Sequence, residues 1–401
     1  MATRPLHILI VFHTSFPEIK GGINKMIATL AETWSREGHR VSILSPGNWE
    51  DRHWSSRQHG AICVHRQRLR MPWDPKNPWR GILGWMVEFP SIFWKLKRFV
   101  RNEKVDCIHL HTPRDYQWVF RMLRFFGGPP YLLTFHGTDA LHFSTGQAKN
   151  MRLLRWIAQG ASGVTAVAIH YATLIEKHYP DLAPVYPVAN GISVGPDPES
   201  ESSPTLPLAL PEHFFIMVGW VEPPKAQDVA IRAWGLLKKD HPHMHLLIVG
   251  DEPMLHPDQP YYPGYQQKIM AMLAELKLGA TVHLTGSLKQ PVLRAIMKKS
   301  TGLVFPSQME GMPYVLLEAG LASLPVVCSD IPAFCELIDP EDNGLLFPLG
   351  DHEALAKAID RIIRDGDWAK RMGKNLNQRV VNRYNAGRMA DRYMELFNKL
   401  S

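Results

Sequence analysis

Short apolar runs alternate along the chain with longer segments in which apolar residues recur every three or four positions. The first run covers residues 7–12, and the segment after it keeps helical spacing up to Gly38. Apolar strands separated by amphipathic helices are typical of a parallel sheet that is covered by helices. In the first half of the chain the pattern predicts strands over 7–12, 41–44, 107–110, 131–135, 164–167 and 185–189.

The composition changes between residues 196 and 211, where Pro, Ser and Glu replace most apolar residues, as in a linker. The alternation then starts again, so we expect an α/β protein with two Rossmann-like domains, over 1–195 and 212–401. A ligand is expected in the cleft at the carboxyl ends of their strands. The last amphipathic segment, about 386–401, could pack on either domain, including back on the N-terminal one. The second half predicts strands over 214–218, 245–249, 282–285, 302–305 and 326–328, and helices over 226–237, 266–276, 292–298 and 314–321.

The composition supports two hydrophobic cores. Of the 401 residues, 45% are hydrophobic and 21% are charged, an ordinary balance for globular domains. Four cysteines without C-x-x-C spacing favour reduced thiols over a zinc site or a disulfide framework. The apolar start lacks a signal-peptide cleavage site, and the apolar stretch 81–94 is too short to span a bilayer. We therefore expect a cytoplasmic protein.

The net charge of +7 is concentrated in one segment. Residues 66–104 hold ten Lys and Arg but three acidic residues, so the rest of the chain is nearly neutral. Within 85–104 aromatic side chains alternate with Lys and Arg, as in a helix that rests on an anionic membrane surface, and 118–126 is similar. A helix that buries its aromatic residues in the first domain fits the same pattern. We expect a peripheral membrane protein with an acceptor entrance at 66–80, and no nucleic-acid partner because no RNA-binding module is present.

The strongest chemical signal is a pair of carboxylates around the start of a predicted helix. Glu310 lies in the loop after the predicted strand 302–305, Pro313 is typical of the first turn of a helix, and Glu318 follows on an otherwise apolar face. Backbone amides at a helix start favour a diphosphate. The carboxylates could instead only favour the helix dipole, which explains Glu310 better than Glu318.

The two glutamates form a Glu-x7-Glu pattern after a predicted strand, and the sequence Ala-Gly-Leu-Ala-Ser-Leu-Pro-Val-Val follows. This arrangement resembles the donor site of glycosyltransferase family 4, also called group 1. Members of that family have the GT-B fold and retain the anomeric configuration of the transferred sugar. The resemblance covers nearly the whole chain. It implies that Glu310 binds hydroxyls of the donor sugar and that Glu318 binds the ribose of the nucleotide. The backbone of Tyr314, Val315 and Leu316 would face the sugar and the phosphate.

Further landmarks of the family occur in the first half. Gly21 and Gly22 resemble its glycine loop, which approaches the diphosphate because no Cβ intrudes, although two glycines also fit a simple strand–helix turn. His136 and Asp139 belong to a His-Gly-x-Asp sequence, which implies that His136 faces the donor sugar and that Asp139 supports the loop. Asn190 begins an Asn-Gly-Ile sequence that resembles the family's Asn-Gly-Val/Ile-Asp turn, which implies that Asn190 supports the site. The sequence assigns no role to the two nearby histidines, His109 and His111.

In the second half, Gly219 to Ala226 aligns with the family's Gly-Arg-(x)n-Lys-Gly. The alignment implies that Lys225 binds the diphosphate and balances charge on the leaving group, while Gly219 supports the loop. Trp220 stands where the family has an arginine, and Ala226 where it has a glycine. Residues Ser287 and Leu288 resemble the strand end beside the nucleotide.

The resemblance implies a retaining hexosyltransferase without metal or cofactor. It would move a sugar from a UDP- or GDP-linked donor to a lipid-linked or glycan acceptor in bacterial envelope polysaccharide synthesis. His136 and Glu310 would be catalytic, because this chemistry depends on positioning and on stabilising an oxocarbenium-like charge. A GT-B epimerase and a sugar phosphorylase fit the motifs less well. A degenerate protein that binds glycan or nucleotide without turnover is supported by Trp220 alone.

Overall fold

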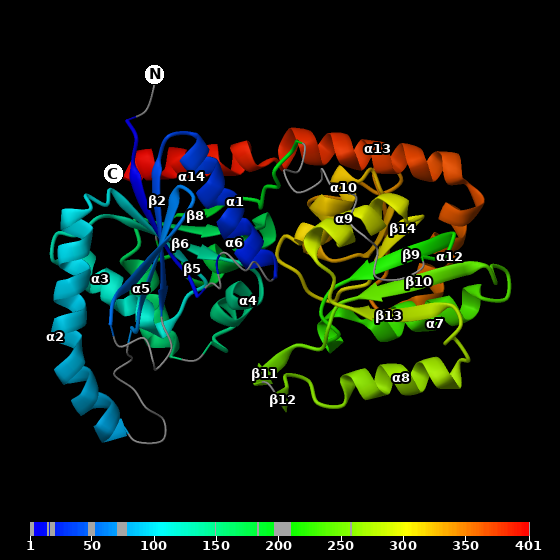
Figure 1. The fold of residues 1–401 in the computed structure, drawn as a ribbon, viewed down its shortest axis with the longest axis horizontal. Coiled ribbons are helices and arrows are strands. Elements are labelled where there is room, and N and C mark those ends of the chain that lie inside the picture. The colour runs from blue at the N-terminus through cyan, green and yellow to red at the C-terminus, as the bar shows by residue number, and fades with distance from the viewer. Residues whose placement is uncertain are drawn as a thin grey trace. The chain divides into compact units, whose positions relative to one another are not determined.

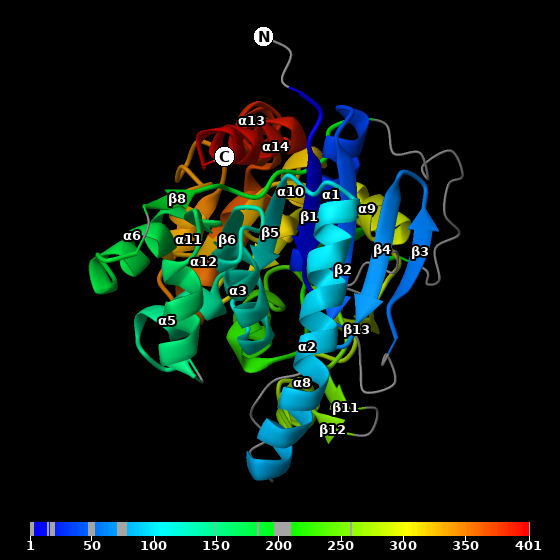
Figure 2. The same ribbon diagram turned by 90° about the vertical axis from the view of Figure 1, so that its left-hand side faces the viewer.

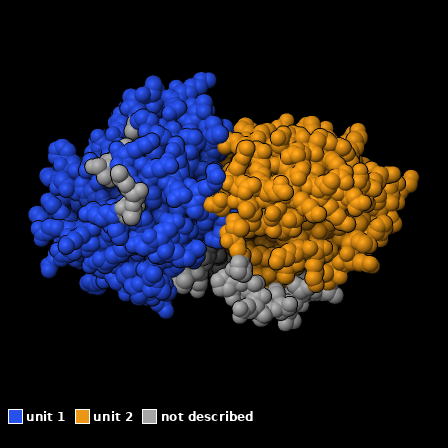
Figure 3. Space-filling view, turned by 90° about the horizontal axis from the view of Figure 1, so that it is seen from above, with its two compact units in different colours: residues 1–193, 386–401 blue, residues 194–385 orange. Residues whose placement is uncertain are grey.

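The computed structural model describes residues 4–13, 16, 21–46, 53–69, 78–148, 150–182, 184–195, 210–256 and 259–400. The chain forms two compact units, shown in separate colours in Figure 3. Unit 1 comprises Met1–Ser193 and Ala386–Ser401, and unit 2 comprises Val194–Asn385. Most of the predicted linker, residues 196–209, and positions 70–77 of the predicted acceptor entrance lie outside the described residues.

Unit 1 is built on one sheet (Figure 1) whose described strands follow the order β3-β4-β2-β1-β5-β6-β7-β8, and Figure 2 labels all of them except β7. Neighbouring strands are parallel except β3 and β4, which are antiparallel. The predicted parallel sheet thus has one antiparallel edge strand, β3, which the sequence pattern missed because its residues are polar and exposed and form no apolar run. Figure 2 shows β3 at the edge of the sheet beside β4. The strands are β1 His7–Val11, β2 Arg40–Pro46, β3 Ser55–His59, β4 Ile62–Gln67, β5 Cys107–His111, β6 Tyr131–Phe135, β7 Gly163–Ala166 and β8 Val185–Pro187.

Helices cover both faces of this sheet. The fully buried strands β1, β5 and β6 supply the centre of the core. On one face the core includes Phe93 and Leu96 of α2 and Phe120 of α3. On the other face Trp34 of α1 packs against Tyr393 of α14. The helices of unit 1 are α1 Gly22–Arg36, α2 Pro78–Asn102, α3 Trp118–Phe125, α4 Thr138–Ser144, α5 Met151–Gln159, α6 Ile169–His178 and α14 Ala386–Leu400, with a short helix η1 Asp115–Gln117.

The C-terminal helix α14, for which the sequence left both packings open, belongs to unit 1. Its first residue, Ala386, donates its backbone N–H to the carbonyl of Ile192 at 2.9 Å. The indole of Trp34 lies 3.4 Å from the carbonyl oxygen of Ala390 and also contacts the ring of Phe397. The chain therefore returns to its first unit at its end.

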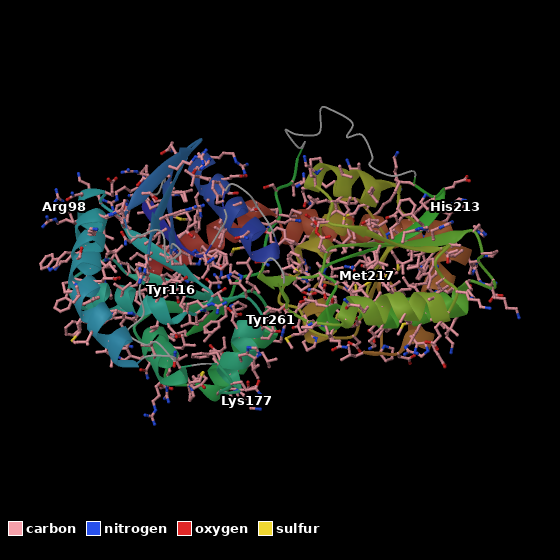
Figure 4. The ribbon with its side chains drawn as sticks, turned by 60° about the horizontal axis from the view of Figure 1, so that its bottom comes forward. Arg98, Tyr116, Lys177, His213, Met217 and Tyr261 are labelled. Atoms are coloured by element: carbon pink, nitrogen blue, oxygen red, sulfur yellow. The ribbon has the colours of Figure 1, made fainter. Side chains whose placement is uncertain are left out.

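Unit 2 is built on a parallel sheet whose described strands follow the order β13-β10-β9-β14-β15-β16. Figure 4 labels Met217 and His213 on its central strand β9. The strands are β9 His213–Val218, β10 Met244–Val249, β13 Val282–Gly286, β14 Gly302–Phe305, β15 Val326–Ser329 and β16 Leu345–Phe347, with a separate hairpin of β11 Met254–His256 and β12 Gln259–Pro260. The helices are η3 Pro223–Lys225, α7 Gln227–Leu237, α8 Tyr265–Glu275, α9 Gln290–Lys299, α10 Tyr314–Leu321, α11 Pro332–Cys335, α12 His352–Arg364 and α13 Gly366–Arg383.

Both sheets contain the doubly wound strand order, which confirms two Rossmann-like units. In each sheet the first strand of the unit lies between its second strand and a strand reached by a crossover, β1 beside β5 and β9 beside β14. Ligands of open α/β sheets bind outside the carboxyl ends of the strands at this point of reversal. The topology therefore predicts that ligands bind at the loops after β1, β5, β9 and β14. None of the helices in the described ranges has the length and apolar character needed to cross a bilayer.

Candidate functional site

At the point of reversal in unit 2, a lysine and a glutamate form a largely but not fully buried ion pair. Lys225 ends the short helix after β9, and Glu310 lies in the loop after β14. The Nζ atom of Lys225 donates to Oε1 of Glu310 at 2.5 Å, and the two side chains are 17% and 11% exposed. Burial by itself would lower the pKa of Lys225, but the carboxylates of Glu310 and Glu222 outweigh it and raise that pKa. Lys225 is therefore a fixed positive charge at neutral pH.

The loop that carries Lys225 contains both departures from the family's motif, Trp220 and Ala226. Ala226 has a left-handed backbone with φ of 53°, a conformation that glycine adopts freely and alanine at a cost of about 1 kcal/mol. Gly219 also has a positive φ, and a Cβ there would lie 3.4 Å from the side chain of Lys225. Trp220, at the position of the family's arginine, is 38% exposed. The structure therefore keeps the backbone of the motif and the lysine, without the arginine.

The second glutamate of the pair lies inside unit 2. Helix α10 begins at Tyr314, so Pro313 precedes the helix and does not occupy its first turn as the sequence suggested. Glu318 is 5% exposed, and the amide Nε2 of Gln290 donates to its Oε1 at 2.5 Å. This hydrogen bond orients the carboxyl group of Glu318 inside the unit. The first turn of α10 contains Tyr314, Val315 and Leu316.

Two strand ends of the same sheet meet beside these groups. Ser287 follows β13 and donates its backbone N–H to Oδ1 of Asp251, which follows β10, at 3.0 Å. Gly286 makes this turn with φ of 71°. Ser287 is exposed and Leu288 is half-buried ahead of α9. The structure thus places both predicted nucleotide-side residues at the carboxyl edge of the sheet.

In unit 1, the loop after β6 is held by one carboxylate. Oδ1 of Asp139 accepts the backbone N–H groups of His136, Gly137 and Ala140 at 2.8, 2.8 and 2.9 Å. Gly137 has φ of 146°, which a side chain rarely adopts. The ring of His136 is thereby fixed at the end of β6, where its Nε2 lies 3.0 Å from Nδ1 of His111 on β5. Burial lowers the pKa of His136 to about 3, so its imidazole is neutral.

The remaining predicted residues of unit 1 lie apart from this loop in the sequence. Gly21 precedes α1 with φ of 80°, and Gly22 is the first residue of that helix. A Cβ on either glycine would meet open space, so the backbone angle and not crowding explains Gly21. Asn190 is buried after β8, and the N–H of the next residue, Gly191, contacts Sδ of Met389 in α14.

The structure brings the predicted residues together in two groups, one in each unit. Lys225 and Glu310 form one with Gly219, and His136 and Asp139 form the other. Sequence reasoning missed Gln290, for which no motif gave a signal, and left His111 without a role although it follows an apolar strand. Within the described ranges no group of three His, Cys, Asp or Glu side chains is placed to hold a metal ion. The cysteines are free thiols, with Cys335 exposed.

Comparisons with known proteins agree with this architecture. The sequence model of Glycosyltransferase Family 4 matches residues 20–195, and that of Glycosyl transferases group 1 matches residues 199–379. UDP-Gal:alpha-D-GlcNAc-diphosphoundecaprenol alpha-1,3-galactosyltransferase of Escherichia coli is 25% identical over 315 residues, which cover 75% of this chain and 77% of that protein.

Solved structures show the same fold. Sucrose-phosphate synthase from Thermosynechococcus elongatus matches with a TM-score of 0.77 at 20% identity, over 98% of this chain and 99% of that one. HepE of Anabaena, solved in complex with UDP, matches with a TM-score of 0.72 at 19% identity, over 99% of this chain and 100% of that one. The chain is a GT-B protein that belongs to the group 1 glycosyltransferases of family 4.

Proposed function

We propose that this glycosyltransferase moves a hexose from a UDP- or GDP-linked donor to a lipid-linked or glycan acceptor, with retention of anomeric configuration, in synthesis of a bacterial envelope polysaccharide. The observation that carries the proposal is the part-buried ion pair of Lys225 and Glu310 at the point of reversal in unit 2. A cation and an anion at that position match the two charged parts of the reaction, the departing diphosphate and the electron-poor sugar.

The donor diphosphate binds to Lys225 and to the start of α10. A buried ammonium group gains from a second anion, and helix-start amides add partial positive charge without proton transfer. When the diphosphate takes the charge of Lys225, the carboxylate of Glu310 becomes available for hydroxyls of the sugar. Since Lys225 and these amides supply the positive charge, the proposed reaction uses no metal and no cofactor.

The reaction exchanges one bond at the anomeric carbon for another on the same face. The bond from the anomeric carbon to the phosphate oxygen breaks, the acceptor oxygen forms the new bond, and the acceptor's proton passes to the phosphate oxygen. Glu310 stabilises positive charge on the sugar ring, and His136 fixes a sugar hydroxyl. Positioning of this kind supplies much of the rate enhancement when no protein nucleophile takes part.

The names of two similar proteins support a nucleotide-linked donor and a lipid-linked acceptor for the proposed reaction. The E. coli relative is named for a UDP-galactose donor and a diphosphoundecaprenol-linked acceptor, and HepE was solved with UDP. In this chain, Glu318 held by Gln290 would bind the ribose hydroxyls. A buried carboxylate suits a ribose because its two oxygens accept both hydroxyl protons.

The outer surface of α2 has exposed apolar and basic side chains, as expected of an enzyme that reaches a lipid-linked acceptor at a membrane. We use the name α2 patch for the exposed apolar and basic side chains of α2 and of the chain just after α2 and α3. Within it, the ammonium group of Lys97 lies 5.5 Å from the ring centre of Trp94 and 5.8 Å from that of Phe126. Arg98 lies on the outer side of α2 in Figure 4. The large apolar members of the patch are Leu83, Met86, Val87, Trp94, Phe125 and Phe126, and its exposed basic members are Lys95, Arg98, Arg101 and Lys104.

Other aromatic side chains of α2 face inward. The helix therefore both buries aromatic residues in the first unit and exposes others beside basic residues, the two arrangements that the sequence left open. Phe93 is 9% exposed and belongs to the core, and Phe89 packs against Trp118. The outer face nevertheless keeps large apolar groups beside cations, a combination that suits the interface of an anionic membrane. We propose that the α2 patch binds the inner face of the cytoplasmic membrane.

The proposed reaction is tested with a panel of UDP- and GDP-hexoses and a lipid-linked acceptor preparation. The expected result is release of nucleoside diphosphate and a product whose anomeric proton coupling in NMR shows the donor's configuration. A product of inverted configuration would contradict the retaining mechanism. Binding of nucleotide sugar without any product, with every donor and acceptor, would favour the degenerate binding protein that Trp220 suggests.

A further inference from the structure

Three histidines of unit 1 form a continuous row along the carboxyl ends of β5 and β6. His109 and His111 are two residues apart on one strand, so their side chains lie on the same face of the sheet. Their ring centres are 3.9 Å apart, and Nδ1 of His111 lies 3.0 Å from Nε2 of His136. Both His109 and His111 have no exposed surface. The row therefore connects the proposed sugar-binding histidine to the interior of the unit.

The inner end of the row is fixed by hydroxyl groups and aromatic rings. Nε2 of His109 lies 2.7 Å from Oγ1 of Thr134, which lies 2.6 Å from Oγ1 of Thr165. Trp34 of α1 and Tyr393 of α14 pack on the ring of His109, at 6.0 and 4.5 Å between ring centres. Packing from two helices leaves these rings little rotational freedom.

The hydrogen-bond partners decide which nitrogen of each ring carries the proton. Among the residues that the structure describes, Nε2 of His111 and Nδ1 of His109 are buried without a partner. A buried N–H without an acceptor is rarer in proteins than a buried acceptor without a donor. His111 therefore carries its proton on Nδ1 and donates it to Nε2 of His136. Since that nitrogen accepts, a neutral His136 carries its own proton on Nδ1.

The groups around His136 keep the row neutral. Burial lowers the pKa of His109 and His111 far below the ordinary histidine value, and the neighbouring imidazoles lower both further. Asp139 on α4 directs Oδ1 to backbone amides, and burial raises its pKa. Burial also raises the pKa of Tyr393 on α14 to about 12. A protonated imidazole in this row would bring a positive charge into a neutral, dry environment.

We propose that His111 is a positioning residue that holds His136 as the neutral tautomer protonated on Nδ1, which makes His136 a hydrogen-bond donor to the sugar and not an acid or base. This inference rests on the proposed function for its placement of the sugar, but the tautomer itself does not. His109, fixed by Thr134, supports the ring of His111. The number of protons on the three histidines does not change during sugar transfer.

The tautomer is measured in the resting protein by two-dimensional 15N–1H NMR of imidazole-labelled protein. The cross-peaks of His136 are identified by their loss in His136→Asn. The expected result is a neutral ring protonated on Nδ1 from pH 5 to pH 8. A ring protonated on Nε2, or one that titrates in that range, would overturn the inference whether or not the enzyme turns over.

Two substitutions of His111 separate positioning from folding. His111→Asn places an amide donor near the position of Nδ1 and should keep both the His136 tautomer and kcat within about threefold of the wild type. His111→Asp places an acceptor there, which should move the His136 proton to Nε2 and lower kcat about 100-fold with a smaller change in KM. Equal loss in both variants, with the His136 spectrum unchanged, would show a merely structural role and overturn the inference.

A separate result distinguishes this inference from the proposed function. If His136→Ala keeps wild-type transfer while the wild-type spectrum shows the Nδ1 tautomer, the assigned tautomer stands and the role of His136 in sugar binding fails. If the spectrum shows the other tautomer while transfer requires His136, the inference fails and the proposed function stands.

Discussion

The ammonium group of Lys225 and the carboxylate of Glu310, 85 positions apart in the sequence, form a hydrogen-bonded ion pair at 2.5 Å. The fold brings them together because β9 and β14 are neighbours in the sheet, so the loops after their carboxyl ends meet. Neither group is in open solvent. An ion pair of this kind is costly to break on one side, because the remaining charge is left buried.

Replacement of Lys225 with Met should affect both stability and activity. The carboxylate of Glu310 loses its cation, so we expect the free energy of unfolding to fall by about 3 kcal/mol and kcat/KM for the donor to fall at least about 100-fold. Urea unfolding and donor kinetics measure the two effects. The matched control is Lys268→Met, which removes the exposed partner of Asp228 and should change either quantity little. Equal effects of the two substitutions would contradict the assigned role.

The same pair sets a pH dependence with a definite sign. Because the folded-state pKa of Lys225 is raised above its ordinary value of 10.5, its contribution to stability is complete below that value and is lost as pH rises through the folded-state pKa. We expect the stability difference between wild type and Lys225→Met to stay constant from pH 7 to pH 10 and to shrink above pH 10.5. Urea unfolding across this range measures it, and a difference that shrinks between pH 7 and pH 9 would contradict the raised pKa.

The amide of Gln290 should matter for nucleotide affinity. Its Nε2 donates to Glu318, so Gln290→Ala leaves the carboxylate with one hydrogen bond fewer to orient it. We expect KM for the donor to rise about tenfold with a smaller change in kcat, in line with the loss of one hydrogen bond to a charged group. Steady-state kinetics with the active donor measure this. Gln267→Ala, an exposed glutamine on α8, is the control, and a similar rise in that variant would show a non-specific effect.

The α2 patch should bind anionic vesicles. Trp94 and Phe125 are 65% and 79% exposed, and transfer of an aromatic ring into an interface contributes on the order of 1 kcal/mol. We expect each change to Ser to weaken binding to vesicles with 30% anionic lipid by about fivefold. Co-flotation on a density gradient measures the binding.

The control for the vesicle experiment is Met270→Ser, which changes an apolar side chain that is 54% exposed on α8 of unit 2. This variant should float like the wild type. Failure of the wild-type protein to float at low salt would remove the membrane part of the proposal, while the glycosyl-transfer part would remain.

The fold could be predicted where burial follows local patterns. Strands such as Tyr131–Phe135 and Gly302–Phe305 are buried at every position and mostly apolar, because helices cover both faces of the sheet. The strand Ser55–His59 could not be found this way, because it is an exposed edge strand with polar residues at most positions. The sequence pattern also missed β16, which has three residues. Shortness alone does not hide a strand, since the apolar run at 185–189 predicted β8, which also has three residues.

The candidate site could be predicted where motifs are contiguous. Glu310 and Glu318 stood out by their spacing around a predicted helix start, and Lys225 by its resemblance to the family's motif. In the structure Lys225 and Glu310 lie in loops after β9 and β14, and Glu318 lies on α10. The contacts that hold them could not be predicted, since Gln290 lies 28 positions from Glu318 and has no motif of its own. His111 was visible next to an apolar strand, but its role depends on the register between β5 and β6. Strand register is a property of the folded sheet.

The most direct test of the account compares wild type with Glu310→Gln for release of nucleoside diphosphate from the donor that the panel identifies. The substitution keeps the volume of the side chain and a hydrogen-bonding group for Lys225, but removes the negative charge that is proposed to face the sugar. We expect kcat to fall by at least about 100-fold, with the folded structure intact by circular dichroism. Wild-type turnover by Glu310→Gln with the same donor and acceptor would contradict it.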